Sequence, residues 1–286
     1  MKIIKYFFEF LIIIILFIIF KILGMKFASN FGSFIGGSFG PFFRSKKKIT
    51  VNIKKALPET SEKNIEIIAK EMWKNYGRIL SEYMFIKNFR NSECKNFLTI
   101  EGQEILNEIK ESKKPVVFIS GHFNNFELMA MQIEKSGIKL AALYRPLNNI
   151  FLNKIMEKIR TKYICHKQIK KGRSGTRELL ESFKNNYSLA LMIDQRVREG
   201  IKIDFFGQKA STTTMPAQLI KKFGCRIVPI YIERTNGIYF KMTINKPISF
   251  DKESTVEEIT LNLNKWLEKM ILINPSQWIW THGRWK

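Results

Sequence analysis

Cysteine is scarce in this sequence, and the three that occur, Cys94, Cys165 and Cys225, lie far apart. An odd, sparse set without C-x-x-C spacing argues against a disulfide framework and against a cysteine-ligated zinc site. We expect three reduced and mostly buried thiols. At 286 residues the chain needs no covalent staple to form a sizeable core.

Histidine is equally scarce, and only His122, His166 and His282 are present. His122 lies five positions before Glu127, which is not the i, i+4 histidine pair of a metalloprotease helix, so we predict no metal site. Ser120, in the context "ISGHF", lacks the G-x-S-x-G elbow of a serine nucleophile. Acid–base chemistry in this chain therefore depends mainly on His122.

Acidic residues are few beside the basic ones: 25 Asp and Glu face 48 Lys and Arg, which gives a net charge of +23. Such an excess favours nucleic acid, an anionic membrane surface, or acidic substrates and partners. The sequence has no zinc finger, RNP-type aromatic motif or helix-turn-helix signature, so we expect no nucleic-acid partner.

The N-terminus, in contrast, is rich in apolar residues. A helix over Ile3–Gly24 would reach roughly 33 Å, enough to cross a bilayer core of about 30 Å. A cleaved signal peptide is the alternative, but no A-x-A site follows. We predict a membrane anchor over residues 1–24, a basic, Gly-rich interfacial segment over 25–59, and a catalytic domain over 60–286. In the second of these, "NFGSFIGGSFGPFF" is a re-entrant or interfacial segment or a flexible linker.

After a predicted helix over Ser61–Lys87, short apolar runs alternate with amphipathic stretches. This alternation predicts an α/β domain with a largely parallel central sheet and helices on both faces, closed by a helix near Val256–Leu272. We predict four buried strands, Pro115–Ser120, Lys139–Arg145, Ser188–Asp194 and Arg226–Glu233, and between them four helices, Asn125–Ser136, Asn149–Cys165, Ser174–Asn185 and Thr213–Phe223.

Polar residues follow three of these strands, where ligands gather in parallel sheets. In "GHFNNFE", a carboxylate on one nitrogen of His122 would leave the other free to take a proton from a hydroxyl. Taken alone, the pair is also explained by a histidine that caps the helix and a solvated Glu127.

The other junctions offer anion-binding groups. Arg145 precedes Pro146, which favours an extended backbone and suits the guanidinium to a phosphate or an oxyanion. Asn148 and Asn149 add donors or simply cap the next helix, and Asp194 and Gln195 end the third strand. Arg173 and Lys209 lie before two further predicted helices, where anions bind and where ordinary caps also occur.

The ordered set of motifs resembles the lipid A biosynthesis (late) acyltransferases, the lauroyl and myristoyl transferases related to lysophospholipid acyltransferases. The set consists of an N-terminal hydrophobic segment followed by "GHFNNFE", "YRPLNN", "DQR", "FFGQKAST" and "PSQWIWTHGRWK". The motifs of this resemblance run from His122 to the C-terminus.

The resemblance implies a glycerolipid-acyltransferase-like fold and roles for five residues. His122 is then the catalytic base, with Glu127 as its carboxylate partner, and Arg145 meets the thioester oxyanion or a phosphate. Asp194 and Gln195 match the family's DQ pair, and Asp194 is a second candidate to hold His122.

Such enzymes take an acyl chain from acyl carrier protein, without a cofactor, and place it on a hydroxyl of a lipid A precursor. The expected location is the cell inner membrane, with the catalytic domain on the cytoplasmic side, where positive flanks are retained. The alternatives are acylation of another phospholipid or glycolipid from acyl-CoA and, in a different class, a non-catalytic basic binding protein tethered to the membrane.

Overall fold

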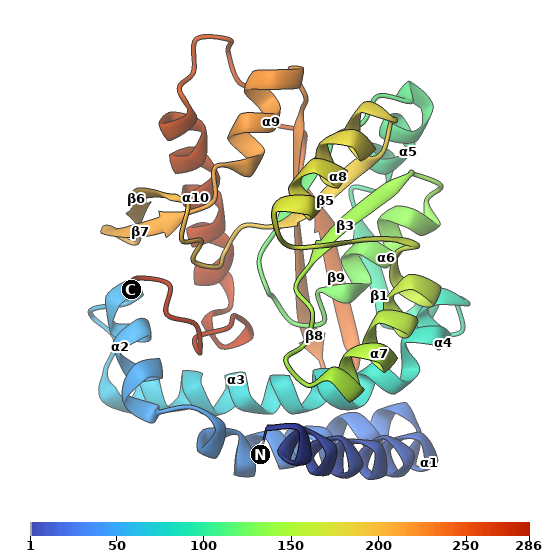
Figure 1. Ribbon diagram of the computed structural model, residues 1–286. Helices are drawn as coiled ribbons and strands as arrows, with labels where there is room; N and C mark the ends of the chain where they lie inside the picture. Colours follow the sequence, from blue (N-terminus) through green and yellow to red (C-terminus); the bar gives the residue numbers. More distant parts are fainter. Residues whose placement is uncertain (1) are drawn as a thin grey trace.

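The computed structural model describes residues 2–286. A seven-stranded sheet with the order β1-β9-β8-β2-β5-β3-β4 forms its centre. Strands β8, β2, β5, β3 and β4 are parallel, whereas β9 pairs antiparallel with β8 and β1 pairs parallel with β9. Helices surround the sheet, with α9 and α10 on one side and α6 and α7 on the other (Figure 1). The fold class predicted from the sequence is therefore confirmed.

The strands of the central sheet and of a separate antiparallel hairpin have these bounds: β1 Leu98–Glu101, β2 Val117–Ser120, β3 Leu140–Tyr144, β4 Lys167–Lys170, β5 Ser188–Met192, β6 Ile201–Phe205, β7 Gln208–Thr212, β8 Ile227–Asn236 and β9 Tyr239–Ile244. The helices are α1 Lys2–Phe43, α2 Lys46–Ala56, α3 Glu62–Glu82, α4 Ile86–Arg90, α5 Gln103–Ser112, α6 Glu127–Lys135, α7 Ile150–Ile159, α8 Arg173–Lys184, α9 Met215–Phe223 and α10 Val256–Ile273, with a π-helical turn at Arg160–Ile164 and short 3-10 turns at Tyr83–Phe85, Lys95–Phe97 and Pro275–Gln277.

The long helix α1 consists of two arms, because Gly24 has φ 73° and ψ 161°, which no helix allows. The second arm packs on α3 through glycines so closely that a Cβ added at Gly77 would lie 1.8 Å from the carbonyl oxygen of Gly32. A Cβ at Gly36 would lie 2.2 Å from the carbonyl oxygen of Trp73. Small residues at four-residue spacing allow such contact between helix backbones. The Gly-rich run is thus a packed helix, and the prediction of a flexible linker is wrong.

The outer faces of α1 expose many large apolar side chains, including Phe8, Ile22 and Phe42 at 60%, 79% and 85% of their surface. An apolar surface of this kind indicates contact with a membrane or a partner. Within residues 2–286, α1 alone is long and apolar enough to cross a membrane, judged by length and composition. Helix α2, by contrast, places Ile49 and Ile53 in the main core.

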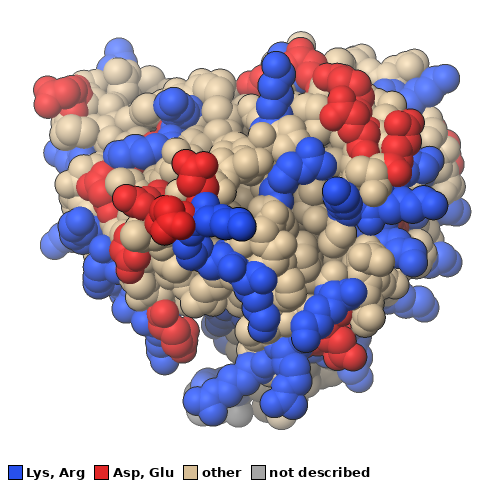
Figure 2. Space-filling view, turned by 90° about the horizontal axis from the view of Figure 1, so that it is seen from above, with Lys and Arg blue, Asp and Glu red and all other residues tan. Residues whose placement is uncertain are grey.

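Helix α3 crosses one end of the sheet, and α1 lies outside it (Figure 1). This is the end where the parallel strands finish, because Glu82 of α3 pairs with Arg234 near the end of β8 at 2.6 Å. The opposite face of the molecule carries basic and acidic side chains in mixture, without one continuous basic patch (Figure 2). The apolar surface of α1 and the carboxyl ends of the strands therefore lie toward the same side.

Candidate active site

His122 and Asp194 lie side by side because of the register of two central strands. Ser120 of β2 pairs with Met192 of β5, and the two residues follow these partners by two positions each. The backbone amide of Ile193 donates to the carbonyl oxygen of Ser120 at 2.9 Å, so the pairing continues past the strand ends. Parallel pairing thus places an imidazole and a carboxylate together at the edge where ligands bind in such sheets.

Asp194 holds His122 by two contacts. Its Oδ1 lies 2.8 Å from Nδ1 of the imidazole, and its Oδ2 accepts from the backbone amide of His122 at 2.8 Å. Oδ2 also accepts from the indole Nε1–H of Trp278 at 2.9 Å. The carboxylate is buried and acts only as an acceptor, so the Nδ1 proton of the ring is held there. Nε2 is left with its lone pair free to accept a proton.

The charge of Asp194 sets the basicity of the ring. Burial lowers the pKa of His122, but the attraction to Asp194 and the hydrogen bond between them outweigh it, so the pKa is raised above its ordinary value. For the same reason the pKa of Asp194 is lowered despite its burial. The pair is an ionised carboxylate that makes its imidazole a stronger base.

Glu127 does not hold the imidazole. Its Oε1 accepts from Arg160 Nε at 2.8 Å and Nη2 at 2.6 Å, and from the hydroxyl of Tyr83 at 3.2 Å. The predicted contact between Glu127 and His122 is therefore wrong, and so is the alternative of a solvated carboxylate, because Glu127 is buried at the start of α6. Of the two candidates left open by the sequence, Asp194 orients the ring.

A second histidine reaches the site from the far end of the chain. The amide nitrogen of Gln195 lies 3.3 Å from Nε2 of His122 and 3.1 Å from Nε2 of His282. With two N–H donors, the amide can donate to an unprotonated nitrogen on each ring. Burial lowers the pKa of His282 to about 4, so this ring is neutral near pH 7.

The C-terminal segment fixes the loop that carries His122. The backbone amide of Asn124 donates to the carbonyl oxygen of Gln277 at 3.2 Å, and the side chains of the same two residues are hydrogen-bonded. The Gln277 amide also exchanges hydrogen bonds with the backbone of Arg234 at 2.8 and 2.9 Å. Asn124 has φ +43°, a conformation that asparagine tolerates better than most residues. Hydrogen bonds from Gln277 of the C-terminal segment thus fix the conformation of the loop that carries His122.

The remaining predicted residues do not join this cluster. Arg145, Asn148, Arg173 and Lys209 are exposed, and within residues 2–286 their side chains make no hydrogen bond or ion pair with His122, Asp194 or Gln195. Lys209 lies on β7 of the β6–β7 hairpin, and α9 follows this strand, as predicted. Asn149, as predicted, caps α7 by accepting from the amides of Phe151 and Leu152.

Sequence reasoning missed Tyr83, Arg160, Trp278 and His282 as site residues. Trp278 and His282 belong to the tail "PSQWIWTHGRWK", so that motif held the signal. No signal in the sequence marked Arg160, because its place in a π-helical turn beside Glu127 depends on packing. Among residues 2–286, no three His, Cys, Asp or Glu side chains are grouped as metal ligands.

The sequence is similar to those of lipid A biosynthesis acyltransferases. The sequence model described as bacterial lipid A biosynthesis acyltransferase matches residues 1–286. Lipid A biosynthesis acyltransferase 2 of Shigella flexneri is 22% identical over 83% of this chain and 76% of its own length. The myristoyltransferase and the lauroyltransferase of lipid A biosynthesis from Escherichia coli K12 are 21% and 22% identical, over 82% and 85% of this chain and 73% and 79% of theirs.

Proposed function

The chain belongs to the bacterial lipid A biosynthesis acyltransferases, and on that premise we propose that it moves a fatty acyl chain from acyl carrier protein to a hydroxyl of a lipid A precursor. The observation that carries the proposal is the His122–Asp194 pair, in which Nδ1 is held at 2.8 Å and Nε2 keeps its lone pair, facing only the amide of Gln195. An imidazole in this state is a base for a hydroxyl group.

The proposed reaction is a direct attack on the thioester. His122 Nε2 takes the proton of the lipid hydroxyl while the oxygen forms a bond to the thioester carbon, giving a tetrahedral oxyanion. The oxyanion then re-forms the carbonyl, the C–S bond breaks, and the imidazolium returns its proton to the thiolate. Asp194 stabilises the imidazolium through its charge without accepting the proton.

Arg145 is the proposed partner of the oxyanion or of a phosphate. It follows β3 at the same sheet edge as His122 and is exposed, without an ion pair of its own among residues 2–286. For Asn148, Arg173 and Lys209 the role of phosphate or carrier contacts stays a prediction, because nothing in their surroundings assigns one. Gln195 donates to both rings where the hydroxyl is expected, so substrate has to displace that amide.

The proposed acyl donor is an acidic carrier protein. A chain with net charge +23 attracts such a partner and raises the rate of encounter. The proposed setting is the inner membrane, with the catalytic domain on the cytoplasmic side. The exposed apolar faces of α1 and the position of the site toward α1 support contact with a membrane, since both bring the site close to a lipid substrate.

The test uses membranes that contain the protein, radiolabelled acyl-carrier-protein thioester and a lipid A precursor. We expect His122→Ala to abolish transfer and His166→Ala to leave it unchanged, since His166 is an exposed histidine paired with Glu134 away from the site. Transfer that survives His122→Ala would refute the general base. Label in another lipid, or transfer from acyl-CoA alone, would favour the alternative acyltransferase.

A further inference from the structure

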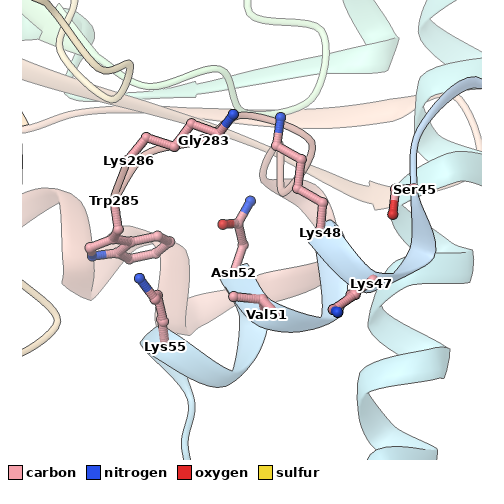
Figure 3. A pocket seen from close by; sticks show the side chains of 9 residues that line it. All are labelled: Ser45, Lys47, Lys48, Val51, Asn52, Lys55, Gly283, Trp285 and Lys286. Atoms are coloured by element: carbon pink, nitrogen blue, oxygen red, sulfur yellow. The ribbon is translucent and has the colours of Figure 1, made fainter.

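A basic pocket lies between α2 and the C-terminal segment. It has a volume of about 270 Å³, and its walls come from two segments distant in sequence. Lys48 and Lys286 extend toward the same end of the pocket, and Lys55 lies on the side of Trp285 (Figure 3). The lining residues are Ser45, Lys47, Lys48, Val51, Asn52, Lys55, Gly283, Trp285 and Lys286.

The lysines of α2 fall into two groups. Lys46 and Lys54 point away from the pocket and pair with Glu66 and Glu62 of α3. Lys47, Lys48 and Lys55, like Lys286, line the pocket and form no ion pair among residues 2–286. Four cations therefore share one pocket, while Lys46 and Lys54 of the same helix are paired with carboxylates.

The charge in the pocket is uncompensated. Burial lowers the pKa of Lys48, and the charges of Arg44 and Lys286 lower it further. Helix α2 also begins here with three lysines and no acidic residue in its first turn, although helix N-termini favour negative charge. A bound anion would relieve both conflicts, and its oxygens would accept charge-assisted hydrogen bonds.

The pocket is joined to the candidate active site through one residue. Asn52 lines the pocket and donates to the carbonyl oxygens of Trp280 and His282 at 2.7 and 2.5 Å. The ring of His282 lies 6.4 Å from that of His122, centre to centre. The charges of Lys48 and Arg44 also reach the His282 ring. The pocket and the candidate active site are thus connected through Asn52 and the C-terminal segment that carries His282.

We propose that this pocket binds a phosphate ester of a substrate while His122 acts on another part of the reaction complex. The proposal rests on the proposed function. Two sources share this chemistry: a phosphate on the acceptor glycolipid, and the phosphodiester of the carrier's prosthetic arm. The first residue that lines the pocket, Ser45, lies two positions after Phe43 in the sequence. Phe42 and Phe43 are 85% and 77% exposed. Lysines that follow an exposed apolar end meet lipid phosphates at a membrane surface, so the acceptor lipid is favoured.

The experiment measures binding without turnover. Purified full-length protein with His122→Ala is placed in phosphatidylcholine nanodiscs and titrated with the phosphorylated lipid A precursor and with its phosphatase-treated form. We expect Lys48→Gln/Lys286→Gln to weaken binding of the phosphorylated lipid at least about tenfold and to leave the dephosphorylated form unchanged. The matched control is Lys54→Gln/Lys241→Gln, which removes two paired cations and the same net charge. Equal losses in both double variants would overturn the inference.

A second arm identifies the source. In active protein, a rise in KM for acyl-carrier-protein but not for acyl-pantetheine, which lacks the phosphodiester, would assign the site to the donor. Failure of the proposed function is recognised separately: the lysine-dependent lipid binding would then persist although no acyl group is transferred. The proposal would be refuted if the lysine substitutions changed neither the binding of the phosphorylated lipid relative to its dephosphorylated form nor the KM for acyl-carrier-protein relative to acyl-pantetheine.

Discussion

The pH dependence of His122 is governed by one carboxylate. The ring acts as a base only when neutral, so transfer should appear as the pH rises through its raised pKa. Asp194→Asn removes the charge that raises this pKa, and burial then lowers it. We expect the acidic limb of the kcat/KM profile to move to lower pH, while kcat falls about 10²-fold or more because the tautomer is no longer fixed. A profile that keeps its position would contradict the assignment of Asp194.

Glu127 is expected to act through Arg160 instead of through the imidazole. Glu127→Gln leaves the buried guanidinium without its counter-charge, which costs about 3–5 kcal/mol of folding stability. We expect a lower thermal midpoint and a shift of the pH limb to lower pH that is smaller than that of Asp194→Asn, because Glu127 is a smaller cause of the raised pKa of His122. Adding Arg160→Gln should recover part of the stability, since no buried charge then remains unpaired. Full stability of Glu127→Gln would show that the pair is not structural.

The difference between the two carboxylates marks the limit of sequence reasoning at this site. Strand order placed His122, Asp194 and Arg145 at one edge, because parallel strands end together. Which carboxylate meets the ring depends on register, and Glu127 is turned toward a π-helical residue that no spacing reveals. His282 is 160 positions from His122, so only packing of the tail brings it near.

Some strands and helices could be predicted from the sequence and others could not. The strands β2, β3, β5 and β8 are apolar runs between polar ends and were predicted within a few residues. Strands such as β4, "KQIK", were not, because only Ile169 of its four residues is buried and the polar sequence has no strand signal. The π-helical turn after α7 was likewise predicted as one continuous helix over Asn149–Cys165.

The packing of α1 on α3 gives a prediction at the level of the element. Gly77→Ala inserts a methyl group 1.8 Å from the Gly32 carbonyl oxygen, so the second arm has to move away. We expect a loss of about 1–3 kcal/mol and faster proteolysis within residues 25–43. Gly37→Ala is the control, because its Cβ meets only the flexible Lys74 side chain at 3.0 Å. Equal stability of the two variants would contradict the close packing.

For the molecule as a whole, the question is whether apolar contact or charge holds it to membranes. Charge attraction is screened within about 3 Å at 1 M salt, whereas burial of apolar surface is not weakened. Because α1 exposes large apolar side chains along both arms, we expect the protein to stay with phosphatidylcholine vesicles through a wash in about 1 M salt. Phe42→Ser/Phe43→Ser should lower the bound fraction, since each ring contributes up to about 1.5–3 kcal/mol when buried.

Tyr239→Ser provides the control for that experiment, because Tyr239 is 48% exposed on β9, apart from α1. Its bound fraction should match that of the wild type in sedimentation assays at low and high salt. Release of the wild type by salt alone would mean that the lysines carry the attachment. The exposed faces of α1 would then need another partner, because water does not cover so large an apolar surface without cost.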